Sequence, residues 1–366
     1  MNSPPSIDHF LCSIDDVNTR IRNIDPRVYD KTRNYLDGGV TWLSPFTTHG
    51  ITTTKHIAEL VLENHKPKSC YRLLFELGWR EFFHRTWQLA GEEIFDDMRN
   101  TQAGVRSEQL PAAIANASTG INTIDECLQH LKSDGLMHNH ARMWIAGMSC
   151  NMAGTHWHEP ARWLHYHLLD GDLASNTLSW QWIAGTFSHK QYVANQGNID
   201  KYSKTAQTGS WLDVPYEAFD NFKAPEHLLE RCDEPYNTSL PGEPIKSLND
   251  DVALRSIWNL NPDWQNDIDN HVIFIDEELA RLWPMSERRW AFIEHWARQC
   301  NARIYYGTVN QLKEACLQAR LVRQEYPACE QWPGEVQDRD WLYPMPDKSF
   351  NSFSQYFKQV KHHAGL

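Results

Sequence analysis

The chain has 366 residues, a mass of 42.7 kDa and a formal net charge of −12 at pH 7. This acidic balance argues against indiscriminate nucleic-acid binding, because neutralising phosphates requires a cationic face. No apolar run reaches the roughly 18 residues of a membrane span, and the N-terminus lacks a basic start followed by an apolar block, so we expect no membrane association and a cytoplasmic location. The eight cysteines form no C-x-x-C pair, which argues against a disulfide framework or a zinc ribbon.

A glycine pair opens the first motif along the chain. Gly38 and Gly39 are followed by Thr41 and Ser44, whose hydroxyls, with nearby backbone N–H groups, can face an anion at the start of the next helix. A plain turn with a threonine or serine cap is the commoner use of such residues. From these residues alone, both interpretations stay open.

Residues 73–87 have helical spacing and few helix breakers. Glu76, Trp79 and Arg80 are three and four positions apart, so they share one face of this helix. A carboxylate beside a tryptophan and an arginine is unusual for a core face. The alternative is a half-exposed helix with a local Glu76–Arg80 ion pair, worth roughly a few tenths of a kcal/mol.

The segment 139–153 is apolar nearly all round, so we expect a central, buried helix. Asn139 and Arg142 at its start would then be polar groups in a dry environment, where they need partners. The following segment, 156–167, has two His-x-His pairs and Glu159, which together can bind zinc. The two histidines of such a pair diverge by about 200° on a helix, so we expect no metal site.

Two carboxylates, an amide and two tryptophans lie close together in residues 170–182. They are Asp170, Asp172, Asn176, Trp180 and Trp182, with small residues between them where a planar ligand could approach the backbone. From composition alone, an Asp-Gly turn entering a tryptophan-bearing core helix is the favoured interpretation.

The C-terminal third alternates between strand and helix patterns. The apolar run 272–275 predicts a strand, Ser286 begins a helix, residues 303–306 predict a second strand, and a second helix starts near Val309. This β-α-β-α order implies parallel strands joined by a right-handed crossover. Prolines, acids and loose patterning in residues 216–263 predict a linker or wrapping loops.

Three motifs carry a family resemblance. Residues 76–82 (ELGWREF), 137–143 (MHNHARM) and 170–182 (DGDLASNTLSWQW) resemble, in order and spacing, motifs of the photolyase/cryptochrome family. The resemblance implies a mainly α fold, namely a photolyase-like helical FAD-binding domain with a small C-terminal α/β unit. We expect the helical domain at 1–215, the linker at 216–263 and the α/β unit with its tail at 264–366. The antenna domain that precedes the flavin domain in ordinary photolyases has no counterpart ahead of these motifs, so no antenna chromophore is expected.

By this resemblance the cofactor is FAD. Its contacts would come from Arg33, Thr41, Leu43, Ser44, Arg80, Asn139, Arg142, Asp170, Asp172 and Asn176. Asp170 would pair with Arg142, because an unpaired buried charge would cost several kcal/mol. Trp42 stands where the family usually has an arginine.

The resemblance also implies the activity of a deoxyribodipyrimidine photolyase, in which an electron from the photoexcited, reduced flavin splits a cyclobutane pyrimidine dimer. The lesion would meet Glu76, Trp79, Asn139, Met143 and Trp182. Trp180 and Trp157 match the family's electron-transfer tryptophans. Asn176 matches the residue beside flavin N5, which is commonly asparagine in photolyases, aspartate in plant-type cryptochromes and cysteine in animal-type cryptochromes.

The expected partner is damaged DNA, with single-stranded substrate preferred. The acidic charge, with Trp42 and His140 in place of family arginines, leaves few means of gripping and bending a duplex. The alternative function is a cryptochrome-like blue-light sensor that binds FAD without repairing DNA. A dark flavoprotein and a metal protein are further alternatives.

Overall fold

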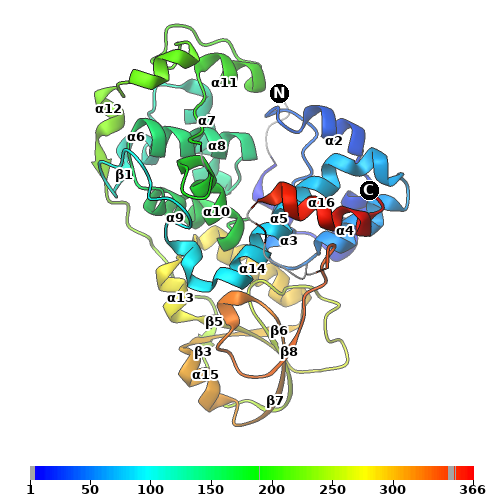
Figure 1. Cartoon of the computed structure of the whole chain (residues 1–366). Helices are drawn as coiled ribbons and strands as arrows, with labels where there is room; N and C mark the ends of the chain where they lie inside the picture. The colour runs from blue at the N-terminus through cyan, green and yellow to red at the C-terminus, as the bar shows by residue number, and fades with distance from the viewer. Residues whose placement is uncertain (1–4, 189, 345–349, 351) are drawn as a thin grey trace. The chain divides into compact units, whose positions relative to one another are not determined.

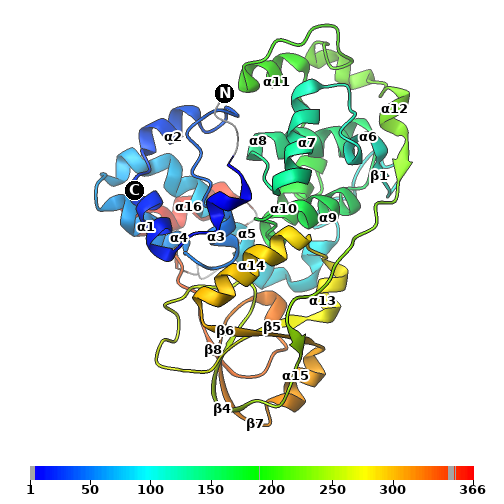
Figure 2. The same cartoon turned by 180° about the vertical axis from the view of Figure 1, so that it is seen from behind.

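The structure is a computed structural model that describes residues 5–188, 190–344, 350 and 352–366. The chain divides into two compact units, each built from stretches that are separate in sequence (Figures 1 and 2). We call the unit that contains residues 27–40 and 89–235 the helical unit. The unit that contains residues 7–26, 41–88 and 236–366 is the mixed unit.

Short and medium-length helices make up most of the helical unit. They are α2 (Pro26–Thr32), α6 (Ala112–Ala115), α7 (Asn122–Asp134), α8 (Asn139–Gly147), α9 (His158–His167), α10 (Leu173–Ala184), α11 (Gln196–Ser203) and α12 (Glu226–Leu229). Strands β1 (Leu110–Pro111) and β2 (Arg231–Cys232) pair antiparallel. Two 3-10 turns, Gly91–Phe95 and Tyr216–Asn221, and a π-helical turn, Met148–Met152, complete the helices and strands described in this unit.

Helix α10 lies at the centre of the helical unit, packed against α8 and α9. Most of its side chains are buried. The helix begins at Asp172, whose side chain accepts a hydrogen bond from Ser175 N (2.8 Å). It ends at Gly185, whose φ of 85° is a left-handed value that glycine adopts without strain. The segment 170–182 is therefore fixed within the core of this unit.

The predicted helix 139–153 is α-helical only as far as Gly147 and continues as a π-helical turn, Met148–Met152. Such turns insert an extra residue and are frequent near functional sites. Asn151 in the turn donates from Nδ2 to the carbonyl oxygens of Ile183 (3.0 Å) and Tyr192 (2.7 Å). The widened turn thereby ties the end of α8 to the end of α10.

The helices of the mixed unit come from both ends of the chain. They are α1 (Ile14–Arg22), α3 (Ser44–Thr48), α4 (Thr54–Leu62), α5 (Tyr71–Ala90), α13 (Glu277–Leu282), α14 (Glu287–Gln299), α15 (Val309–Ala315) and α16 (Phe353–Val360), with 3-10 turns at Ile7–Phe10, Pro67–Cys70, Pro327–Cys329 and Lys361–Ala364. Helix α16 lies on α5, where Phe353 and Phe357 contact the Phe75 ring with centroids 4.8 and 5.0 Å apart. Gly78 permits this approach, because a Cβ there would lie 3.1 Å from the Phe357 ring.

A parallel six-stranded sheet forms the rest of the mixed unit, in the order β3-β6-β5-β4-β7-β8. The strands are β3 (Glu243–Pro244), β4 (Asn249–Arg255), β5 (His271–Asp276), β6 (Ala302–Gly307), β7 (Gln318–Gln324) and β8 (Glu335–Gln337). The predicted β-α-β-α order is confirmed by β5, α14, β6 and α15. The predicted fold class, a mainly helical chain with a small C-terminal α/β unit, is also confirmed.

The boundaries of the parts differ from those expected. The expected linker, residues 216–263, contains β3 and β4, and residues 7–26 and 41–88 belong with the sheet. Buried His49 shows the physical reason, because its Nδ1 bonds Ile257 O (2.7 Å) and its Nε2 accepts from Arg289 Nε (3.2 Å). A guanidinium only donates, so His49 is a neutral ring protonated at Nδ1. This buried network fastens the turn after α3 to the turn after β4 and to α14.

Candidate functional site

Arg142 and Asp170 form an ion pair in the helical unit. Arg142 Nη2 lies 2.8 Å from Asp170 Oδ1 and 2.7 Å from Oδ2, and Arg142 Nε donates to Met137 O (3.0 Å). The side chain of Asp170 is 3% exposed and that of Arg142 is 23% exposed. Because so buried a carboxylate is costly without a cation, each side chain requires the other. The structure brings these two predicted residues together.

The start of α10 carries three more polar groups next to this pair. Asp172 caps the helix, and Asn176 Nδ2 donates to Ala161 O (2.9 Å), which fixes the amide against α9. Ser175 Oγ is buried and has no hydrogen-bond partner among the described residues. This hydroxyl could therefore bond a ligand at the segment that sequence analysis selected.

The three predicted tryptophans of the helical unit differ in exposure. Trp157 and Trp180 are buried, whereas Trp182 is 39% exposed. Trp180 and Trp182 differ because residues two apart lie on opposite sides of a helix. Trp157 Nε1 donates to Asp97 Oδ1 (2.8 Å), which holds its indole in one orientation. This burial pattern suits Trp157 and Trp180 to a role inside the protein and Trp182 to contact with a large ligand.

The start of α8 is less buried than the sequence predicted. Asn139 is exposed and Met143 is half-buried, so the expected dry environment at Asn139 is wrong. Asn139 follows the cap residue His138, whose Nδ1 accepts from His140 N (3.0 Å). Burial, followed by the nearby His140 and Arg142, lowers the pKa of His138 to about 4, which keeps the ring neutral and able to accept.

Arg33 lies in the helical unit just after α2. Its Nη1 donates to Asp30 O (2.9 Å), so in this conformation the guanidinium bonds the turn that precedes it. Its assignment as a flavin contact stays a prediction.

The remaining predicted flavin residues belong to the mixed unit. Trp42 has a φ of 51°, an uncommon left-handed value for a large side chain. Ser44 is the first residue of the five-residue helix α3, and Leu43 at its cap supplies no side-chain hydrogen bond. Thr41 Oγ1 lies 3.5 Å from Leu43 N, which is long for a hydrogen bond. The predicted anion loop is therefore a strained turn leading into a short helix.

Helix α5 presents Glu76, Trp79 and Arg80 on one face, as expected, and all three are half-buried. The Trp79 indole is stacked on the Phe353 ring of α16, with centroids 4.0 Å apart and planes inclined by 20°. Arg80 Nη2 lies 3.4 Å from Thr48 Oγ1. Phe353 was not among the predicted site residues, because no local sequence pattern links α5 to a helix near the other end of the chain.

Glu81, which follows the predicted flavin contact Arg80, was not among the predicted site residues either. The Glu81 carboxyl accepts from Leu342 N (2.7 Å) and Tyr343 N (2.9 Å) and bonds the Thr54 hydroxyl. Burial raises its pKa to about 7, although these hydrogen bonds and nearby Arg85 act in the opposite direction. The signal that could have found it is an acidic residue directly before two phenylalanines, Phe82 and Phe83, that are buried.

Metal binding and membrane spanning both lack support in the described residues. No group of three histidine, cysteine, aspartate or glutamate side chains is arranged there to hold a metal ion. Within the same residues, no helix combines the length and the apolar character that crossing a membrane demands.

Residues 73–212 match the family model for the FAD binding domain of DNA photolyase. The match contains all three motifs found in the sequence. This part of the chain is therefore similar to the flavin domain of the photolyase/cryptochrome family. The matched segment begins in α5 and runs past α11, so it includes every predicted site residue from Glu76 to Trp182. Arg33, Thr41, Leu43 and Ser44 precede it.

Parts of the chain are similar to individual known proteins. A chloroplastic/mitochondrial cryptochrome DASH of Ostreococcus tauri is 33% identical over 232 residues, which are 58% of this chain and 42% of that protein. A deoxyribodipyrimidine photo-lyase of Streptomyces griseus is 35% identical over 112 residues, which are 30% of this chain and 25% of that protein. The solved structure of a Synechocystis sp. PCC6803 cryptochrome gives a TM-score of 0.47 at 23% identity, covering 52% of this chain and 43% of that one. The aligned part of the chain thus spans less than half of each relative.

The residues of the helical unit fit FAD in their chemistry. A flavin ring and a ribityl chain require hydrogen-bond donors and acceptors. This unit supplies both through the paired Arg142 and Asp170, the amide of Asn176 and the unpartnered Ser175 hydroxyl. The family model confirms the prediction of FAD as the cofactor class.

Proposed function

We propose that this protein repairs cyclobutane pyrimidine dimers in DNA with FAD and blue light, and that it favours single-stranded DNA. The observation that carries the proposal is the buried Arg142–Asp170 pair beside the neutral amide of Asn176, within the segment that matches the photolyase flavin domain. When bound, reduced FAD supplies an electron on excitation by light.

The side chains of the helical unit would hold and orient the cofactor. Asp170 would accept hydrogen bonds while Arg142 keeps its charge compensated, and the capping bond of Asp172 would keep the start of α10 rigid. Asn176 would offer a neutral amide, which neither releases a proton readily nor adds a negative charge next to a reduced ring. The other proposed flavin contacts are Arg33, Thr41, Leu43, Ser44, Arg80 and Asn139.

The proposed lesion contacts combine aromatic faces with polar groups. They are Glu76, Trp79, Asn139, Met143 and Trp182. The exposure of Trp182 supports its part in this, because a base can stack on an accessible indole with a gain of about 1–3 kcal/mol. Trp157 and Trp180 would return electrons to the cofactor from within the protein, since both are buried.

The proposal is tested on purified protein reconstituted with FAD. Flavin released by heat is expected to be FAD and not FMN. After chemical reduction, blue light is expected to restore the ultraviolet absorbance of thymine in an irradiated oligo(dT). Stable FAD binding without any such recovery would overturn the repair function and leave a flavoprotein.

A blue-light sensor is the second candidate, and one observation favours it. The Trp79 ring that would stack on a lesion is stacked on Phe353 instead. A sensor needs no lesion contact at Trp79, so this stack would persist in its working state. A light-dependent change of bound FAD without DNA repair and without release of α16 would support the sensor. The expected cytoplasmic location stays a prediction under either function.

A further inference from the structure

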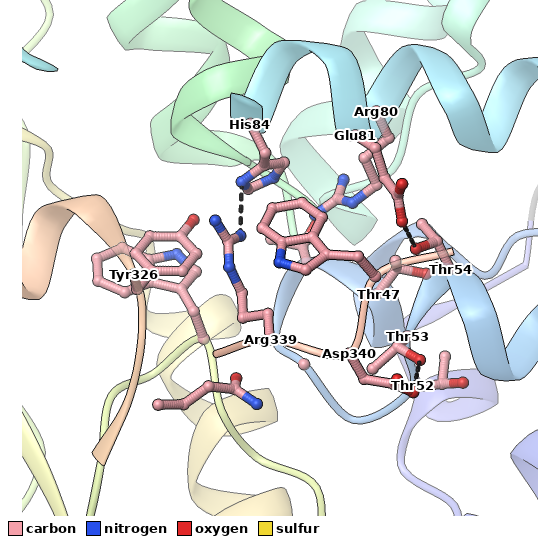
Figure 3. Close-up of a pocket in the computed structure, with 15 residues that line it drawn as sticks. Thr47, Thr52, Thr53, Thr54, Arg80, Glu81, His84, Tyr326, Arg339 and Asp340 are labelled. Carbon is pink, nitrogen blue, oxygen red and sulfur yellow. Dashed lines mark hydrogen bonds between the residues drawn. The ribbon is translucent and has the colours of Figure 1, made fainter. Parts of the chain in front are cut away.

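A cavity of about 70 Å³ lies at the carboxyl edge of the sheet, entirely within the mixed unit (Figure 3). One wall follows the ends of three parallel strands, with Trp258 after β4, Tyr326 after β7 and Arg339 after β8. The lining also includes Thr52, in the turn between α3 and α4, and His84 on α5.

The cavity lies at the position where parallel sheets commonly bind ligands, beyond the carboxyl ends of two strands. From β4, the strands β5 and β6 follow on one side, while β7 and β8 follow on the other. The connections therefore change direction between β4 and β7, and a crevice opens beyond the carboxyl ends of two strands at such a point. Trp258 and Tyr326 come from the segments after these two strands, and their rings are stacked at 4.5 Å with planes inclined by 6°.

Three of the residues that line the cavity each have a buried polar atom without a hydrogen-bond partner among the described residues: Trp258 Nε1, Arg339 Nη2 and Thr52 Oγ1. The first two can only donate. The side chains of Trp258 and Thr52 are more than nine-tenths buried, so bulk water does not satisfy them. Leaving such groups unpaired destabilises the folded protein, and a molecule that accepts hydrogen bonds removes this penalty.

The acidic groups near the cavity are already engaged. Glu325 accepts from Arg339 Nε (2.8 Å), and Asp340 accepts from Lys55 Nζ (2.9 Å) and Thr53 Oγ1 (3.3 Å). Glu81 accepts from two backbone N–H groups, as described above. The groups of Trp258 and Arg339 that are left to bond a ligand are therefore hydrogen-bond donors. One of them belongs to a cationic guanidinium.

Arg339 is held in place on several sides. Its Nη1 bonds His84 Nδ1 (2.9 Å), and its guanidinium lies 5.1 Å from the Tyr326 ring centroid and 4.2 Å from that of Trp341. A cation fixed in this way loses little freedom when it binds a ligand, which favours affinity.

We propose that this cavity binds a small oxyanion, the phosphate or carboxylate group of a metabolite, through Arg339, Trp258 and Thr52. A cavity of about 150 Å³ can hold benzene, so a space of about 70 Å³ suits a compact group of a few heavy atoms. The predicted flavin loop, Thr41 to Ser44, does not line the cavity. Arg80 does line it, and we leave Arg80 unchanged in the test because it is also a proposed flavin contact.

The test is calorimetric titration of FAD-saturated protein with inorganic phosphate, and separately with acetate, at constant ionic strength set by chloride. Saturation with FAD keeps phosphate away from the flavin site. Trp258→Phe retains the stacked ring and removes only the N–H donor, and Thr52→Val removes only the hydroxyl. The matched control is Trp332→Phe, because Trp332 Nε1 is also buried without a partner among the described residues but does not line the cavity.

Phosphate or acetate is expected to bind the unchanged protein and the Trp332→Phe protein equally. Binding is expected to weaken at least about tenfold in Trp258→Phe, because the lost hydrogen bond is one to a charged group and a tenfold change corresponds to about 1.4 kcal/mol. The preferred anion identifies the group recognised. Absence of binding by both anions to the folded protein would overturn the proposal and leave ordered water as the occupant. Equal weakening in Trp258→Phe and Trp332→Phe would overturn it as well.

Discussion

The indole of Trp79 and the phenyl ring of Phe353 are stacked 4.0 Å apart, with their planes inclined by 20°. Trp79 belongs to α5 and to the segment that matches the photolyase domain, whereas Phe353 begins α16. A base can stack on the covered face of Trp79 only after Phe353 leaves it. The proposed repair function therefore requires α16 to shift whenever a lesion binds Trp79.

Phe353→Ala is expected to increase the affinity for an irradiated oligo(dT). Removing the ring abolishes a stacking contact worth about 0.5–1.5 kcal/mol, so the gain should lie between about twofold and tenfold. Phe357→Ala is the matched control, because Phe357 on the same helix packs on Phe75 and Tyr71. Fluorescence anisotropy with labelled oligonucleotides measures both variants. A similar gain in both would assign the effect to loosening of α16 as a whole.

Asp170→Asn is expected to reduce FAD retention and to lower the stability of the protein. The substitution keeps the shape of the side chain but leaves Arg142 without its charge partner, which costs about 3–5 kcal/mol at a fully buried pair and less here, where Arg142 is partly exposed. Asp37→Asn is the control, because it removes a surface pair with Lys204 that is worth about 0–1 kcal/mol. Flavin content after gel filtration and thermal unfolding measure the two effects. Unchanged retention in Asp170→Asn would remove this pair from the proposed flavin contacts.

Trp157→Phe is expected to slow light-driven reduction of bound FAD and to leave repair intact once the flavin has been reduced chemically. The buried indole would carry electrons to the cofactor without touching DNA. Trp163→Phe, at another fully buried tryptophan of the same unit, controls for loss of packing. Absorbance changes under blue light measure reduction, and thymine recovery measures repair. Equal loss of repair after chemical reduction would show that Trp157 serves folding or substrate binding.

Repair of dimers in single-stranded DNA is expected to be at least about tenfold faster than in duplex. An already flexible dinucleotide avoids the few kcal/mol of unpairing and unstacking, and the net charge of −12 leaves few phosphate contacts with which to bend a duplex. The rates are compared on matched substrates over a range of salt concentrations. A shallow salt dependence should accompany the preference, and equal rates on both substrates would contradict it.

The contribution of Glu81 to the stability of the protein is expected to fall as the pH rises from about 4.5 to about 7, against an opposite contribution from His138, whose pKa is lowered to about 4. The pKa of Glu81 is raised by burial to about 7 in the folded protein, from a usual value of 4.5. At Glu81 the folded state therefore binds more protons than the unfolded state between these values, and unfolding becomes easier as the proton is lost. The effect is of order 2–3 kcal/mol at most. Denaturant unfolding at several pH values measures this contribution as the difference in free energy of unfolding between the unchanged protein and Glu81→Gln, and a difference that does not change with pH within this window would contradict it.

Local patterns were sufficient for some elements and not for others. The β5-α14-β6-α15 run was predictable, because each piece has its own apolar period. Strand β4 was not, since Asn249, Asp250 and Asp251 make its first half polar while the remainder is too short to distinguish from a loop. In the site, the pairing of Arg142 with Asp170 followed from a family motif. The Phe353 stack on Trp79 and the bonds of Glu81 to residues 342–343 depend on tertiary packing, which spacing does not encode.

The alternation of the chain between the two units bears on the order in which the protein can fold during synthesis. The stretch 41–88 cannot complete its packing when it leaves the ribosome, because His49 awaits Ile257 and Arg289, and α5 awaits α16. The stretch 89–235, which holds α8, α9 and α10, is continuous and can pack as soon as it has been made. The helical unit should therefore form first, while the apolar face of α5 stays uncovered until the last helix arrives. During that interval the nascent chain exposes Phe75, Trp79 and Phe82 to solvent, and this is the period in which it is most prone to aggregate.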